Sequence, residues 1–152
     1  MNAIRRIMVA VDFSKISKHL VGYALALARK CDAEVHLVHV INQRDIEAIR
    51  KVAEVTSVIS LPEQIEARRE DLLAALMEIL SELDAVPDAV GRHVKTGIPS
   101  EALIDTIKEI DIDLVIMGTR GRGQFAGMLF GSTAARMLHK CPVPLLTLRN
   151  DA

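Results

Sequence analysis

The chain has 152 residues, half of them apolar, and a formal net charge of −1. This length predicts one domain over residues 1–152, with enough apolar residues for a substantial core. The balanced charge and the scarcity of aromatic residues (three Phe, one Tyr and no Trp) argue against a nucleic-acid partner, which needs a basic surface or rings that stack on bases.

Apolar runs alternate with segments of helical periodicity along the chain. Runs such as IMVAV at residues 7–11 and EVHLVHVI at residues 34–41 are typical of strands buried in a parallel sheet. Residues 42–61 are the least regular part, with one or two helical turns expected within 45–54 and a loop after them. The predicted elements are strand 7–11, a helix capped by Ser14 or Ser17 that runs to Cys31, strand 34–41, a helix from Pro62 to Leu83, strand 89–94, a helix that begins at Pro99 or Ser100, strand 114–117, a short helix after the glycines and strand 143–148.

This alternation predicts an α/β domain with a five-stranded parallel sheet and helices on both faces. With the strand order 3-2-1-4-5, the order reverses between the first and fourth strands. Open α/β sheets bind ligands at that point, beyond the carboxyl ends of the strands. Asp12 follows the first strand and Gly118 follows the fourth, so we expect both to face one crevice.

Five of the eight glycines fall within fourteen residues between the fourth strand and the last helix. Ordinary turns need one or two glycines, and this density costs backbone entropy. A loop whose N–H groups close around a ligand at a helix N-terminus suits phosphate, and Ser132 is the expected N-cap of that helix. The glycines are Gly118, Gly121, Gly123, Gly127 and Gly131, followed by Ser132 and Thr133.

Two common glycine motifs do not account for this loop. A P-loop requires Gly-Lys followed by Ser or Thr, and the sequence contains no Gly-Lys pair. Residues 121–126 fit the G-x-G-x-x-A of a dinucleotide-binding unit, which requires an acidic residue about 20 positions later. Residues 127–148 contain neither Asp nor Glu.

The spacing Gly118-x-x-Gly121, nine residues, then Gly131-Ser132 resembles the ATP-binding branch of the universal stress protein family. IMVAVDFS at 7–14, HVI at 39–41 and CPVPLL at 141–146 are similar to the first, second and last strands of that family. The resemblance covers nearly the whole chain, and residues 42–61 are the part that does not match.

The resemblance implies a Rossmann-like fold of the adenine nucleotide hydrolase-like type. It implies a nucleotide-responsive stress regulator that binds ATP, or else AMP or ADP, with Mg²⁺ or Mn²⁺ held by the phosphates. Adenine and ribose would lie near Val11, Asp12 and Val40, and the phosphates near the glycines. The candidate nucleotide-binding residues are Val11, Asp12, Val40, Met117, Gly118, Arg120, Gly121, Arg122, Gly123, Gly131, Ser132 and Thr133.

The sequence offers no catalytic residues and no metal site. No Ser-His-Asp arrangement, paired carboxylates or HExxH motif is present, and His36 and His39 are expected on opposite faces of one strand. We therefore expect slow hydrolysis or none. Two alternatives are a true ATPase or nucleotidyl transferase and a nucleotide-free dimerising module.

Some of these candidate residues also have a purely structural explanation. Asp12 is also a good N-cap for the helix that follows it. Arg120 and Arg122 are alternatively solvated loop charges.

Cysteine usage and the N-terminus predict a cytoplasmic protein with no membrane partner. Cys31 and Cys141 lack CxxC spacing and are expected as buried free thiols in a reducing compartment. The apolar run after Arg5 and Arg6 is too short for a signal peptide or a membrane span.

The last strand predicts a homodimer. Residues 143–148 (VPLLTL) are apolar at nearly every position, and the order 3-2-1-4-5 places them at a sheet edge. Exposed apolar edges favour pairing with another chain. The family resemblance also implies pairing through this strand.

Overall fold

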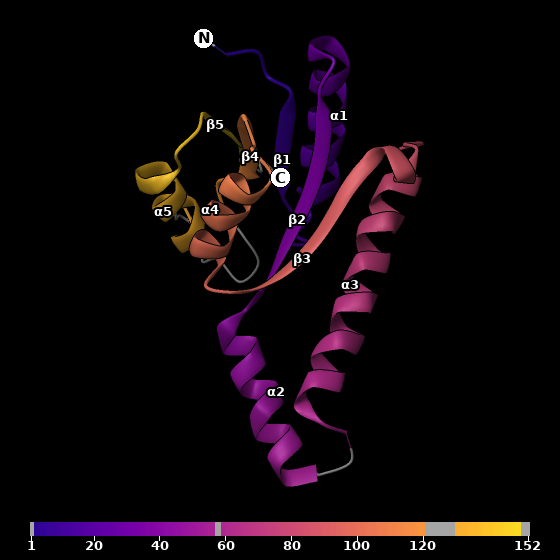
Figure 1. Ribbon diagram of the computed structural model, residues 1–152, viewed down its shortest axis with the longest axis vertical. Coiled ribbons are helices and arrows are strands. Elements are labelled where there is room, and N and C mark those ends of the chain that lie inside the picture. Colours follow the sequence, from indigo (N-terminus) through magenta and orange to yellow (C-terminus); the bar gives the residue numbers. More distant parts are fainter. Residues whose placement is uncertain (1, 57–58, 121–129, 150–152) are drawn as a thin grey trace.

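The computed structural model describes residues 2–56, 59–120 and 130–149, in which five parallel strands form one sheet of order β3-β2-β1-β4-β5 (Figure 1). The predicted fold class and strand order are confirmed. The elements are β1 (Arg6–Ala10), α1 (Ser17–Cys31), β2 (Glu34–Asn42), α2 (Gln43–Thr56), α3 (Leu61–Glu82), a 3₁₀ turn (Pro87–Ala89), β3 (Val90–Gly97), α4 (Pro99–Glu109), β4 (Leu114–Gly118), α5 (Ser132–Lys140) and β5 (Leu145–Leu148).

The sheet divides the core into two apolar layers. Successive side chains of β1 point to opposite faces, so Ile7 and Val9 belong to one layer and Met8 to the other. The first layer lies under α1 and α3, and the second lies under α4 and α5. Because both faces of β1 are covered, its three central residues have no exposed surface, and residues 7–10 form a continuous apolar run.

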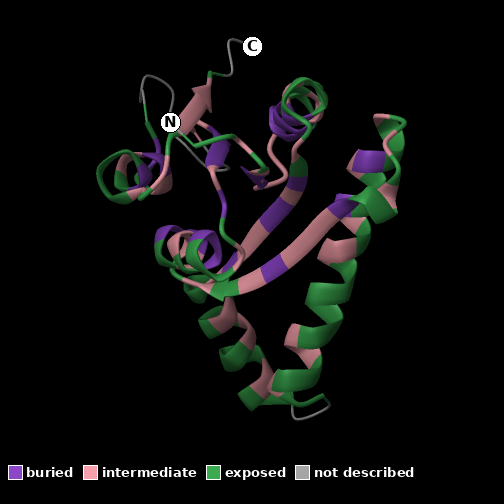
Figure 2. Ribbon diagram, turned by 45° about the horizontal axis from the view of Figure 1, so that its top comes forward, coloured by how far each residue is buried: buried purple, intermediate pink, exposed green. Residues whose placement is uncertain are grey.

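The least regular part of the sequence contains a long helix, so the expectation of one or two turns there was wrong. α2 is continuous over 14 residues. Its apolar residues recur at helical spacing, and Ile46, Ile49 and Ala53 are half-buried. α2 packs beside α3, and the two project from the sheet as an arm, defined here as residues 43–56 and 61–72 (Figure 1). No residue of α2 is buried, and the arm is largely exposed (Figure 2).

Two strand boundaries differ from the predictions by more than one residue. β3 continues to Gly97 instead of ending at Val94, because the polar residues 95–97 still pair with β2. β5 begins at Leu145 instead of Val143. Pro144 has no N–H group to donate to a ladder, although its carbonyl accepts a hydrogen bond from the Val115 N–H at 3.0 Å.

The helix cap and the cysteines require two further corrections. The N-cap of α1 is Ile16, which makes no side-chain capping bond, so neither Ser14 nor Ser17 is the cap. Both cysteines are free, as expected. However, Cys31 is exposed and Cys141 is half-buried, so the expectation of burial was wrong.

His36 and His39 make separate contacts, as predicted. His36 Nδ1 lies 3.1 Å from His93 Nε2 on the neighbouring strand, whereas His39 contacts the Val11 carbonyl. Burial lowers the pKa of His93, and the nearby His36 and Lys95 act in the same direction. Gly91 lies opposite His36 in the register, and a Cβ at position 91 would overlap the His36 imidazole.

We expect Gly91→Ala to lower the free energy of unfolding by about 1–3 kcal/mol, because the imidazole must move to admit the methyl group. Gly22 is the matched control. It lies within α1, and a Cβ there would meet only Leu83 at an ordinary 3.6 Å. Gly22→Ala should raise the free energy of unfolding by about 0.5–1 kcal/mol. Urea unfolding followed by circular dichroism measures both, and changes of the same sign would contradict this account.

Candidate functional site

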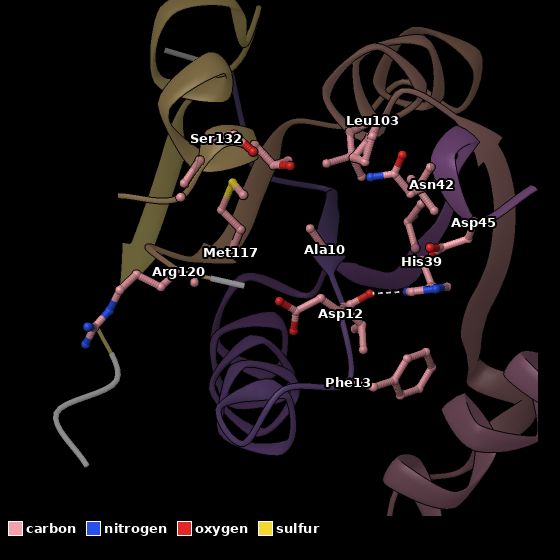
Figure 3. Close-up of a pocket in the computed structure, with 18 of the residues that line it drawn as sticks. Ala10, Asp12, Phe13, His39, Asn42, Asp45, Leu103, Met117, Arg120 and Ser132 are labelled. Carbon is pink, nitrogen blue, oxygen red and sulfur yellow. Dashed lines mark hydrogen bonds between the residues drawn. The ribbon is translucent and has the colours of Figure 1, made fainter. Parts of the chain in front are cut away.

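A cavity of about 380 Å³ opens at the carboxyl ends of β1, β2 and β4. It therefore lies where the strand order reverses, as the sequence predicted. Its walls come from these three strand ends, the start of α5, the side of α4 and the base of the arm (Figure 3).

Nine of the twelve candidate residues line this cavity, although they come from three distant parts of the chain. The other three, Gly121, Arg122 and Gly123, lie outside the described residues. The nine are Val11, Asp12, Val40, Met117, Gly118, Arg120, Gly131, Ser132 and Thr133.

Asp12 fixes the turn between β1 and α1. Its Oδ1 accepts hydrogen bonds from the Ser14 N–H at 2.9 Å and from the Ser17 hydroxyl at 3.3 Å. Between them, Phe13 has a φ of 60°, a left-handed conformation that non-glycine residues rarely adopt. Asp12 is thus not the N-cap of α1, but it does support the entry to that helix.

His39 closes the wall between β1 and β2. Its Nδ1 lies 2.7 Å from the Val11 carbonyl oxygen and must carry the hydrogen, because a carbonyl only accepts. The Phe13 ring packs against the imidazole, with centroids 4.8 Å apart. Neither residue was among the site residues predicted from the sequence. Their positions in the sequence could have indicated them, since His39 lies near the end of its strand and Phe13 directly follows Asp12.

On the opposite wall, the backbone of Gly118 lies close to its neighbours. A Cβ on Gly118 would lie 3.4 Å from both the Arg120 carbonyl oxygen and the Ile16 side chain. The Gly131 N–H donates to the Thr119 carbonyl at 2.7 Å, which brings the start of α5 back to the end of β4.

The N-cap of α5 is Gly131, so the expectation that Ser132 caps the helix was wrong. The chain enters the helix at Gly131 with extended backbone, which makes Ser132 the first helical residue. Ser132 lies at the cavity wall (Figure 3). The first N–H groups of a helix lack intrahelical partners and carry positive partial charge, so this end of the cavity favours an anion.

The arm supplies a wall that sequence analysis did not anticipate. α2 begins directly after β2, and the Asn42 Oδ1 accepts a hydrogen bond from the Arg44 N–H at 3.1 Å. The arm places Arg44, Asp45, Arg68 and Leu72 on the cavity. The signal in the sequence was a run of polar residues directly after the second strand.

The cavity thus combines an apolar middle with polar ends. Val38, Val40, Leu103 and Met117 form the apolar part, which suits a flat ring system. Among residues 2–56, 59–120 and 130–149, no three His, Cys, Asp or Glu side chains are placed to hold a metal ion. None of the described helices has the length and apolar character needed to cross a membrane.

Comparison with known proteins identifies relatives over nearly the whole chain. The model of the Universal stress protein family matches residues 3–149. The chain is 26% identical to the universal stress protein MJ0577 of Methanocaldococcus jannaschii, with 95% of this chain and 94% of that protein covered. It is 27% identical to the stress response protein NhaX of Bacillus subtilis, with 95% and 97% covered.

Solved structures show the same fold at lower identity. The structure of MJ0577 has a TM-score of 0.80 at 23% identity and 99% coverage of both chains. A universal stress protein in complex with cAMP has a TM-score of 0.66 at 19% identity, with 97% of this chain and 98% of that one covered. The Archaeoglobus fulgidus protein in complex with dAMP has a TM-score of 0.59 at 20% identity, with 96% and 98% covered.

Asp12→Ala should lower the free energy of unfolding by about 1.5–3 kcal/mol, because two hydrogen bonds to a carboxylate are lost. Asp12→Asn should cost about half as much, since an amide oxygen still accepts from the Ser14 N–H but without the charge. Urea unfolding of the wild type and the two variants measures whether stability falls in the order wild type, Asp12→Asn, Asp12→Ala. An alanine variant as stable as the wild type would mean that Asp12 does not hold this turn.

Proposed function

This chain belongs to the universal stress protein family, and we propose that it binds an adenine nucleotide, ATP foremost, in the cavity at the carboxyl ends of β1, β2 and β4. One observation carries the proposal. A single cavity joins apolar side chains to an anion-favouring helix N-terminus at the point where the strand order reverses. The cAMP and dAMP complexes of two structural relatives support the choice of adenine.

The described residues fit the parts of such a ligand. Val11, Asp12 and Val40 would surround adenine and ribose, with Met117 against the ring. Gly118, Gly131, Ser132 and Thr133 would cradle the phosphates, with Arg120 opposing their charge. On the sequence pattern we assign Gly121, Arg122 and Gly123 to the same cradle. AMP and ADP fit the same assignment, and Mg²⁺ or Mn²⁺ would be held by the phosphates.

The role that follows is a cytoplasmic stress regulator whose state depends on bound nucleotide. Phosphoryl transfer needs groups that position the attacking water and hold metal, besides a phosphate cradle. We assign no residue to those tasks, so turnover should be slow or absent. Steady-state phosphate release well above about 1 s⁻¹ would instead favour a true ATPase.

ATP should raise the melting temperature. A ligand at a hundred times its Kd adds about 2.7 kcal/mol of stability. For a domain of this size that corresponds to roughly 5–10 °C, at about 2–4 °C per kcal/mol. The test compares the melting temperature of nucleotide-free protein with and without millimolar ATP and magnesium. The absence of a shift would refute the proposal.

Two variants locate the site. Gly131→Val should fold, because the backbone there is extended, yet fail to respond to ATP, because the side chain occupies the phosphate end. Arg120→Ala should weaken ATP more than adenosine, since only the phosphates meet its charge. Gly22→Ala, remote from the cavity, should retain the full shift.

We also propose a homodimer that pairs through β5. β5 lies at one edge of the sheet and pairs only with β4 among the described strands. All four of its residues remain half-exposed although three are leucines. An apolar edge of this kind is covered when a second copy pairs with it.

Leu146→Lys should convert the dimer to monomers, because a charge would be buried at the pairing edge. Static light scattering at tens of micromolar gives the mass. Leu146 also packs against the core, so circular dichroism must show that the variant is folded. A monomeric mass for the wild type would refute the dimer, whatever the variant does.

A further inference from the structure

Two imidazole rings meet on the sheet, outside the cavity of the proposed function. His36 Nδ1 on β2 lies 3.1 Å from His93 Nε2 on β3, whereas the ring centroids are 5.3 Å apart. The rings therefore face each other through their nitrogens instead of stacking. This is the arrangement of an N–H···N hydrogen bond, which holds one hydrogen between the two rings.

The register of the sheet and a glycine allow this contact. His36 lies opposite Gly91 in the pairing of β2 with β3, and His93 follows two residues after Gly91. Residues two apart on a strand share one face of the sheet, so both rings lie on that face. A Cβ at position 91 would overlap the His36 ring, so the absence of a side chain there lets the ring lie over β3 and reach His93.

The hydrogen-bond partners assign the hydrogens when both rings are neutral. His36 Nε2 lies 3.4 Å from Glu34 Oε2, and a carboxylate only accepts, so this nitrogen carries the hydrogen of His36. His36 Nδ1 must then accept. The hydrogen between the rings accordingly comes from His93 Nε2.

One added proton fits this arrangement, and a second does not. A proton on His36 Nδ1 gives a cation whose two N–H groups both have acceptors, which are Glu34 Oε2 and the Nε2 of a neutral His93 in its other tautomer. When His93 is also protonated, both facing nitrogens carry hydrogens and both rings are cations. The hydrogen bond is then replaced by repulsion between like charges.

The other charges near the pair largely offset one another. Glu34 also forms an ion pair with Arg6 of β1 at 3.3 Å. Beside His93, Lys95 forms an ion pair with Glu109 of α4 at 3.1 Å, and the two act on the pKa of His93 in opposite directions. The His36 side chain is only 17% exposed, so water screens the two rings weakly. The groove that His93 lines also contains Arg69 of α3, Arg92 of β3 and Asp105 of α4.

We propose that the His36–His93 pair is an acid-sensitive switch that holds β3 to β2 until both rings are protonated, and then weakens the pairing of these strands. β3 is an edge strand and pairs only with β2 among the described strands, so no strand on its other side holds it in place (Figure 1). The switch is independent of any bound nucleotide. The competing explanation is that two ordinary histidines fill space on the sheet and titrate separately.

The direction of the pH dependence follows from His93. Its pKa is lowered in the folded state, first by burial and next by His36. The neutral ring therefore stabilises the fold fully above about 6.5, the ordinary value for histidine. This stabilisation is lost as the pH falls through the lower value of the folded state.

Nuclear magnetic resonance of the imidazole nitrogens tests the pair directly. In the wild type, His36 and His93 should protonate in two steps at least about one pH unit apart, with the His93 step the lower one. His36→Asn leaves an amide near the position of Nδ1 but no charge, so the His93 step should move up toward about 6.5. His19→Gln, at an exposed position of α1, is the control and should leave both steps in place. Separate, ordinary steps in the wild type, or a His93 step that does not move in His36→Asn, would overturn the proposal.

Amide hydrogen exchange tests whether the protons act on the strand. Below the lower step, the β3 amides of the wild type should lose protection, while those of β1 keep theirs. The combined variant His36→Asn and His93→Gln retains a neutral hydrogen bond between two amides and has nothing to titrate there, so its β3 protection should not change. Circular dichroism at neutral pH confirms that each variant is folded. Unchanged β3 protection in the wild type, or the same loss in the combined variant, would overturn the switch even if the two rings titrate as a pair.

Discussion

β1 pairs in parallel on both sides, with β2 and with β4, and it is covered by helices on both faces. A shift of one residue in its register would move Met8 into the layer of Ile7 and Val9 and disrupt both layers at once. The end of β1 is therefore fixed, and with it the point where Asp12 leaves the sheet. The turn held by Asp12, the entry to α1 and the crevice toward β4 all take their positions from this strand.

Features that depend on burial were predictable from the sequence. IMVAV, EVHLVHVI and LVIM are apolar because the sheet is covered on both faces, so their parallel arrangement followed from the alternation with helices. The strand order 3-2-1-4-5 did not follow from that alternation, and the structure confirms it. The position of the cavity followed in turn, because Asp12 and Gly118 end strands on either side of the reversal. Candidate site residues at strand ends could thus be predicted from the sequence.

Features that depend on weak or local interactions were not predictable from the sequence. α2 has only a half-buried stripe formed by Ile46, Ile49 and Ala53, so its pattern is faint beside that of a core helix. Ser132 is a better N-cap by residue type than Gly131, yet the close approach of Gly131 to Thr119 sets where the helix starts. His39 is a common strand residue, and its bond to the Val11 carbonyl appears only when β1 and β2 are side by side.

The lack of buried residues in α2 has an evolutionary consequence. Substitutions in a segment that contributes no core are rarely large in free energy, so the arm is free to change sequence and length while β1 is not. Yet the first turn of the arm borders the cavity. The part of the molecule with the fewest packing constraints therefore borders the cavity, so a substitution there can alter the ligand that fits without disturbing the sheet that holds it.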